Sequence, residues 1–214
     1  MSSVLAEYIE SAIEKRVPTG SEIAELLRSS ARHIPYICRY LVHDDARVRF
    51  VAADALFRIS RSNRSAITKY LDAILRGLKF QDVKTRIKLL RTISPIVFEY
   101  PTRVERYLAT ISWCLYNPEH GRLRSAAARC IGNLAAIDER RASLYIPMLL
   151  QTINKHRYNP ETWNSIHALA FPLRNGNAKR FRKRIREVII PFRRRGEESK
   201  KRIVRRILKL SATR

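Results

Sequence analysis

The chain has 214 residues, with 43 Lys plus Arg against 19 Asp plus Glu and a formal net charge of +24. Hydrophobic residues make up 45% of it, which excludes a disordered basic tail and supplies enough apolar surface for one sizeable core. A positive excess of this size repels itself, and proteins that carry one usually bind polyanions.

The predicted elements are all helices, because the chain contains six glycines, nine prolines and no alternating apolar strand pattern. The first helix is expected over residues 3–16, and Ser21 is expected to cap the N-terminus of a second helix that ends near residue 31. Five helix pairs follow in chain order: 34–42 with 46–60, 67–78 with 83–99, 104–116 with 123–137, 144–155 with 161–173, and 179–193 with 199–210.

A paired basic signature recurs at the start of the second helices. Arg47-Val48-Arg49 returns 37 residues later as Lys84-Thr85-Arg86, and 38 residues after that as Arg122-Leu123-Arg124. This period is too long for a coiled-coil heptad and fits one helix–turn–helix unit of a solenoid. Each second helix carries an apolar stripe that a single pair cannot bury, so neighbouring units are expected to stack.

Residues 44–56 resemble the second-helix motif of HEAT repeats, through the acidic turn Asp44-Asp45, the Val-Arg pair and the Ala-rich helix that follows. Residues 120–128 match this motif less closely, and residues 82–90 less still. The resemblance implies an all-α fold, a right-handed α-solenoid of about five HEAT-like helix pairs. It gives little guidance on function, because HEAT arrays serve many unrelated tasks.

Three segments follow from this assignment. Residues 1–32 are expected to form N-terminal capping helices, and residues 33–177 the HEAT-like repeats. Residues 178–214 are expected to form a basic helix pair that continues the solenoid.

The two basic positions of each signature have different expected roles. In HEAT repeats, the arginine that matches Arg49, Arg86 and Arg124 commonly forms a ladder with acidic turn residues, here Asp45 and Asp82. The resemblance therefore favours structural ion pairs at these positions.

Arg47, Lys84 and Arg122 lie two residues earlier and off the apolar stripe. Stacking of the repeats would align them along one surface, where they could follow a phosphate backbone. A solvated row with no function is the alternative.

The C-terminal segment carries the strongest charge. From residue 174 to 214 there are 17 basic and 3 acidic residues, and apolar residues recur among them at helical spacing. We predict two basic amphipathic helices that contact phosphates, against a solvated capping repeat or a membrane-surface role. The candidate residues are Arg180, Arg182, Lys183, Arg184, Arg186, Arg193, Arg194, Arg195, Lys200, Lys201, Arg202, Arg205 and Arg206.

Three aromatic residues are candidates for stacking on nucleobases. Trp113 is expected on the outward face of its helix, Trp163 occupies the position of the repeat arginines, and Tyr158 lies in the preceding turn. Packing against a neighbouring repeat is the alternative for both tryptophans.

A weaker resemblance links the chain to HEAT-like alkylpurine DNA glycosylases, which are basic helical solenoids of comparable size. Their catalytic pattern, a Trp followed four residues later by Asp, has a counterpart in Trp113 and position 117. That position is Asn117, which supplies no carboxylate. The sequence also lacks Gly-rich phosphate loops, GxSxG and HExxH motifs. We therefore predict a protein that is not an enzyme.

No cofactor or metal ion is predicted, because Cys38, Cys114 and Cys130 are scattered and the five histidines do not cluster with other ligands. The cysteines read as reduced core thiols. The N-terminus lacks a signal-peptide pattern and no stretch reaches the length of a membrane helix, so a cytoplasmic protein without a membrane partner is expected.

The sequence thus predicts non-catalytic binding of DNA or RNA through the phosphate backbone, with low sequence specificity. The alternative is an adaptor that docks an acidic protein partner, including one within a large ribonucleoprotein. A glycosylase-like repair enzyme is a third possibility, and the oligomeric state stays open.

Overall fold

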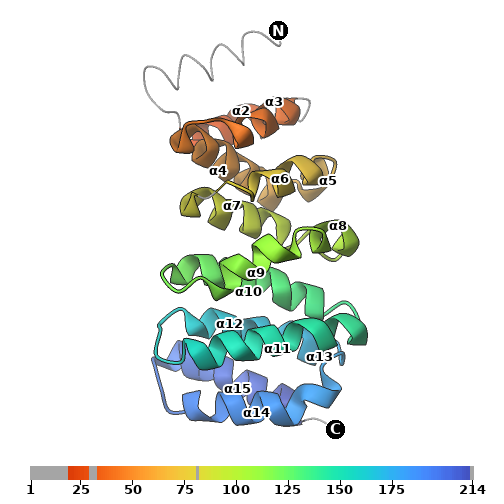
Figure 1. The fold of residues 1–214 in the computed structure, drawn as a ribbon, viewed down its shortest axis with the longest axis vertical. Coiled ribbons are helices and arrows are strands. Elements are labelled where there is room, and N and C mark those ends of the chain that lie inside the picture. The colour runs from red at the N-terminus through yellow and green to blue at the C-terminus, as the bar shows by residue number, and fades with distance from the viewer. Residues whose placement is uncertain (1–18, 29–32, 81, 213–214) are drawn as a thin grey trace. The chain divides into compact units, whose positions relative to one another are not determined.

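A computed structural model describes residues 19–28, 33–80 and 82–212. The chain divides into two compact units, Met1–Ile96 (unit 1) and Val97–Arg214 (unit 2). Within the described residues every regular element is helical (Figure 1). The helix expected over residues 3–16 lies outside the described residues.

In unit 1 the second helix of each pair forms the centre of the packing. The elements are α2 (Gly20–Arg28), α3 (Ile34–Arg39), η2 (Tyr40–Val42), α4 (Ala46–Ser62), α5 (Arg64–Thr68), α6 (Leu71–Gly77) and α7 (Val83–Ile93). Helix α4 packs against α2 on one side and α7 on the other (Figure 1). Leu56 of α4 and Leu89 of α7 are fully buried, as expected for a stripe covered by its neighbours.

Unit 2 repeats the arrangement. Its elements are α8 (Pro101–Glu105), α9 (Leu108–Tyr116), α10 (Gly121–Ala135), α11 (Glu139–Lys155), α12 (Thr162–Ala168), α13 (Ala170–Arg174), η3 (Lys179–Phe181), α14 (Arg182–Ile189), η4 (Ile190–Phe192) and α15 (Glu198–Ala212). Helix α10 packs against α9, α11 and α12, and α15 packs against α12, α13 and α14. Each of the five predicted pairs is present.

Two of the predicted first helices are broken rather than continuous. The helix expected over 67–78 is divided at Tyr70, and the helix expected over 104–116 is divided at Tyr107. Both tyrosines have nearly the same backbone angles, and each amide donates to the carbonyl three residues earlier. A single tight turn of 3₁₀ type therefore bends both helices at equivalent places.

The prediction that Ser21 caps α2 is wrong. The amide of Thr19 donates to Glu22 Oε2 at 2.7 Å, and the amide of Glu22 donates to Thr19 Oγ1 at 3.3 Å. This reciprocal pair is a capping box, and it places Ser21 inside the helix. The side chains of the acidic turn residues Asp45 and Asp82 cap α4 and α7, a role that was not predicted from the sequence.

The buried arginine of each signature holds the turn that precedes its helix. Arg49 donates from Nη1 to the carbonyls of His43 and Asp44, at 2.6 and 2.7 Å, and from Nε to Asp82 at 2.9 Å. The ion pair with Asp82 confirms the ladder contact for Arg49 and links α4 to the next repeat. Asp45 is instead bonded by Arg47.

The other two arginines donate hydrogen bonds to backbone carbonyl oxygens. Arg86 donates to the carbonyl of Leu78 at 2.9 Å. Arg124 donates from Nη1 to the carbonyls of Asn117 and Pro118, at 2.7 and 2.9 Å. A cation thus meets the carbonyl end of the preceding helix in each case, where the helix dipole favours positive charge.

A three-residue network joins α8 to α11 in unit 2. Arg141 donates to both oxygens of Glu105, at 2.8 and 3.1 Å, and the hydroxyl of Tyr145 donates to Glu105 at 2.8 Å. The hydrogen bond from Arg141, with that from Tyr145, holds the pKa of Glu105 below its usual value.

Because this pKa is lowered on folding, the stabilisation exists above the ordinary glutamate pKa and is lost as the pH falls through the lower folded value. We expect Glu105→Gln to lower the free energy of unfolding by about 1–2 kcal/mol at pH 7. The difference from the wild type should shrink below a pH of about 4. Urea unfolding at pH 7 and pH 3 measures it, and an equal difference at both values would exclude the carboxylate as its source.

Candidate nucleic-acid interface

Three turns of unit 2 come together at one edge, here called the turn edge and comprising residues 117–121, 156–161 and 193–197. Asn164 of α12 donates to Ser125 of α10 at 3.0 Å, which joins the starts of these helices. The guanidinium of Arg195 lies 5.1 Å from the ring centroid of Tyr158, which joins the second and third turns. Stacking of the repeats therefore places these three turns side by side.

Tyr158 and Arg195 form an exposed pair at this edge. Tyr158 is 84% exposed, and Arg195 lies over its ring while also approaching the Phe192 ring at 5.9 Å. An arginine held against an aromatic face is pre-positioned, and both groups can contact a base or a phosphate. The sequence predicted both residues but not their contact.

Trp163 packs into the next helix pair. Its ring meets Phe192 edge-to-face with centroids 5.5 Å apart, and it lies so close to Gly196 that an added Cβ would be 3.0 Å from it. In this repeat the preceding turn is held by Thr162 and not by an arginine: the Thr162 hydroxyl donates to the carbonyl of His156. The break in the arginine pattern at Trp163 therefore reflects a different contact between neighbouring repeats.

Trp113 is 52% exposed on α9, while Ile111, Cys114 and Leu115 of the same helix are buried. The outward position expected for this ring is confirmed. Asn117, four residues on, is buried and accepts amide hydrogen bonds from the next turn. The Asn117 side chain therefore stabilises the turn between α9 and α10.

His156 adds no charge to the turn edge at neutral pH. Burial, with the nearby charges of Arg124 and Lys155, lowers the pKa of His156 below its ordinary value. The imidazole of His156 is therefore neutral at pH 7.

In the part of the chain that the structure describes, most of the predicted cations in the C-terminal helix pair are not neutralised by a carboxylate. Arg205 is paired with Glu198, and Lys200 lies 3.9 Å from Glu197. Arg180 lies over the Phe181 ring, and Arg182 is half-buried. Within the described residues, these predicted cations make no ion pair: Lys183, Arg184, Arg186, Arg193, Arg194, Lys201, Arg202 and Arg206.

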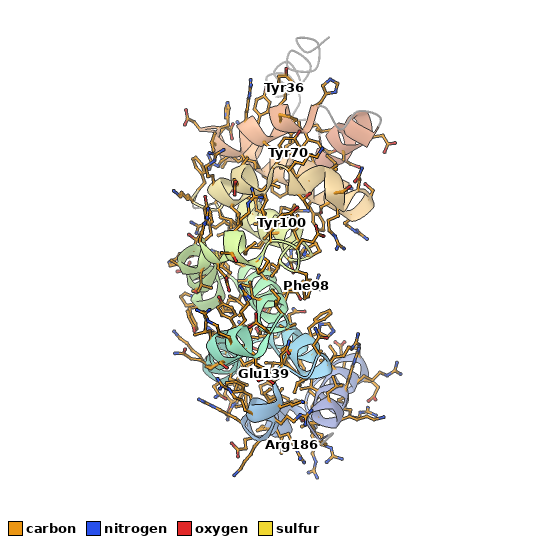
Figure 2. All side chains as sticks on the ribbon, turned by 90° about the vertical axis from the view of Figure 1, so that its right-hand side faces the viewer. Tyr36, Tyr70, Phe98, Tyr100, Glu139 and Arg186 are labelled. Atoms are coloured by element: carbon orange, nitrogen blue, oxygen red, sulfur yellow. The ribbon has the colours of Figure 1, made fainter. Side chains whose placement is uncertain are left out.

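These eight residues, here called the C-terminal cations, lie on the exposed or half-exposed faces of α14, α15 and the turn between them. The opposite faces bury Ile185, Ile189, Val204 and Ile207. Figure 2 shows Arg186 at the C-terminal end of unit 2. Packing therefore uses one side of each helix and leaves the basic side to solvent, as the amphipathic pattern predicted.

The earlier basic positions fall in different surroundings. Arg122 is exposed at the start of α10 in unit 2. Arg47 is 78% exposed, and its guanidinium is bonded to the capping carboxylate of Asp45 at 2.8 Å. Lys84 is exposed at the start of α7, and together with Arg47 it lines a groove of unit 1.

This groove was missed in the sequence. It has a volume of about 850 Å³ and is lined by Thr19 and Gly20 at the start of α2 and by side chains of α4 and α7. Phe50, Asp54 and Lys88 lie in its wall. The spacing of four residues between Phe50 and Asp54 puts them on one helix face, but nothing local connects that face to Lys88 on α7.

The described residues contain no group of three or more His, Cys, Asp or Glu side chains arranged to hold a metal ion. The three cysteines are buried, which confirms them as core thiols, and burial raises the pKa of Cys38 and Cys130 to about 12. A search of the same residues for a helix long and apolar enough to cross a membrane finds none.

Comparisons with known proteins bear on the fold alone. No protein-family model matches the chain, and the comparison with curated proteins finds no match. An engineered protein of known structure has a TM-score of 0.69 and 19% identity over 90% of each chain.

Designed armadillo repeat proteins are similar to the same extent. One, computationally designed for modular peptide recognition, has a TM-score of 0.69 and 16% identity over 95% of this chain and 93% of its own. Another, in complex with the peptide (KR)4, has a TM-score of 0.69 and 15% identity over 96% of this chain and 94% of its own. The fold of the chain is an α-solenoid of helical repeats.

Proposed function

We propose that the chain is a non-catalytic nucleic-acid-binding protein whose main contact surface is the C-terminal cations together with the turn edge of unit 2. The observation that carries the proposal is that eight predicted cations have no carboxylate partner among the described residues. Unpaired cations held on one helix pair repel one another. Phosphates of a bound strand would relieve this repulsion and release their counterions.

The Tyr158–Arg195 pair supplies a second kind of contact. A base can stack on the exposed tyrosine while the guanidinium reaches a neighbouring phosphate. Such contacts tolerate any base, so low sequence specificity follows. Arg122, exposed at the start of α10, extends the basic surface along unit 2. In this proposal Trp163 supports the turn edge by packing, and Trp113 is a separate exposed ring.

A scaffold that docks an acidic protein partner is the second candidate. Of the designed armadillo proteins similar to this chain, one was designed for modular peptide recognition and another is in complex with the peptide (KR)4. A chain with a net charge of +24 would select the opposite charge.

Replacing Arg193, Arg194 and Arg195 together with alanine is the direct test. We expect affinity for a labelled duplex to fall by tenfold or more at about 100 mM salt. The slope of log K against log salt should become less steep by about 2 to 3, because each lost phosphate contact removes about 0.9 for duplex DNA. Fluorescence anisotropy over about 50–300 mM salt measures both quantities for duplex DNA, single-stranded DNA and structured RNA.

The matched control is R61A/K69A/R91A, which removes the same charge from exposed positions of unit 1. Its slope should stay close to that of the wild type. Equal changes in the two triple variants would indicate that only net charge matters. Weak binding of the wild type to all three nucleic acids at low salt would favour the acidic protein partner.

A further inference from the structure

The groove of unit 1 presents hydrogen-bond donors and few free acceptors. Four basic and two acidic side chains line it, the acidic ones being Asp54 and Asp82. Both oxygens of Asp54 already accept hydrogen bonds, from Lys88 and from Arg58 Nε at 2.8 Å. Burial alone would raise the pKa of Asp54, but these hydrogen bonds outweigh it and hold the pKa below its ordinary value.

Both oxygens of the second carboxylate, Asp82, also accept hydrogen bonds. Asp82 Oδ1 accepts the amide of Thr85 at 3.0 Å, and Oδ2 accepts Arg49 Nε at 2.9 Å. Donors remain on the basic side chains. Lys84 is exposed with no ion pair among the described residues, and Arg58, about half-exposed, also lines the groove. An occupant must therefore bring acceptors, and anionic ones suit the charge.

Apolar side chains form much of the remaining wall. Ala46, Phe50, Val51 and Val83 all line the groove, and the Phe50 ring lies 5.7 Å from Lys88 Nζ. A phosphodiester backbone gains nothing from such a wall, whereas aliphatic side chains of a peptide would be desolvated against it. The volume of about 850 Å³ suits a few residues of extended chain.

We propose that the unit 1 groove binds an acidic protein segment in which aspartate or glutamate alternates with apolar residues. The carboxylates pair with Lys84, Arg58 and the spare donors of Arg47, while the apolar side chains lie against Phe50 and Val83. This site is separate from the C-terminal cations, so the chain has two anionic ligands of different chemistry.

The test uses three labelled octapeptides, (DL)4, (KL)4 and (DS)4, with fluorescence anisotropy at about 150 mM salt to screen non-specific attraction. We expect (DL)4 to bind about tenfold or more tighter than the other two, because only it supplies both charge and apolar contact. Lys84→Glu should weaken (DL)4 binding by about five- to tenfold. The variant will fold, since Lys84 is exposed in the first turn of α7, where the helix dipole favours a glutamate.

Lys183→Glu is the matched control, with the same charge reversal at an exposed position of α14 in unit 2. It should change (DL)4 affinity less than about twofold. The R193A/R194A/R195A variant should keep (DL)4 binding while its nucleic-acid affinity falls, so the two proposals fail or hold separately.

Equal binding of (DL)4 and (DS)4, or of (DL)4 and (KL)4, would overturn the proposal. So would a Lys183→Glu effect as large as that of Lys84→Glu, since this would place the peptide on the C-terminal cations. Octathymidylate binding that Lys84→Glu weakens as much as (DL)4 binding would assign the groove to nucleic acid instead.

Discussion

Replacing Arg124 with leucine is expected to lower the free energy of unfolding by about 3 kcal/mol. Arg124 is only 3% exposed, and its guanidinium donates to the carbonyls of Asn117 and Pro118. Leucine would keep the apolar stem and leave both carbonyls at the turn without this donor. Urea unfolding followed by circular dichroism measures the loss, with the m-value showing whether the unfolding transition itself has changed.

The control lies two residues away on the same helix. Arg122 is exposed, so Arg122→Leu should change the free energy of unfolding by less than about 0.5 kcal/mol. Under the proposed function it should instead weaken nucleic-acid binding, which Arg124→Leu should leave nearly unchanged in the folded protein. A large stability loss for Arg122→Leu, or none for Arg124→Leu, would contradict the roles assigned to these two arginines.

Gly132→Ala is expected to destabilise unit 2 by about 2 kcal/mol, although alanine is the better helix former. A Cβ at this position would lie 2.5 Å from the carbonyl oxygen of Ala168 and 2.9 Å from its Cβ. The obstacle is backbone on α12, so relief requires α10 and α12 to move apart and their contact to loosen. Thermal and urea unfolding both measure the effect.

Gly121→Ala provides the comparison at the same nominal distance. Its Cβ would also meet an atom at 2.5 Å, but that atom belongs to the flexible carboxyl group of Glu161. A rotation of the Glu161 side chain removes this clash, so we expect a change within about 1 kcal/mol. Equal losses at the two glycines would mean that the helix spacing at Gly132 is not the limiting contact.

The helix pairs were predictable because their signals are local. Apolar residues at three- and four-residue spacing marked each stripe, and the acidic turn residues Asp45 and Asp82 stand directly before α4 and α7. The breaks at Tyr70 and Tyr107 were missed, because neither position carries a proline or glycine and the bend depends on packing. The cap of α2 was missed by two residues because Ser21 and Thr19 offer the same chemistry.

The candidate site was predictable only in part. Charge density along residues 174–214 indicated a basic surface from composition alone. The partners of individual cations depend on the fold, as Arg86 and Arg124 show by bonding carbonyls where the repeat pattern implied carboxylates. The unit 1 groove needs three helices, so no single stretch of sequence contains its charge pattern.

Both tryptophans of the chain, Trp113 and Trp163, belong to unit 2. Trp163 is half-buried against Phe192 of η4, so its emission will shift when the α12–η4 contact opens, while circular dichroism follows the helices of both units. Tryptophan fluorescence, excited selectively over tyrosine, therefore records the unfolding of unit 2 alone. If the two optical signals give different midpoints, the halves unfold independently, and the chain needs no added label to separate them.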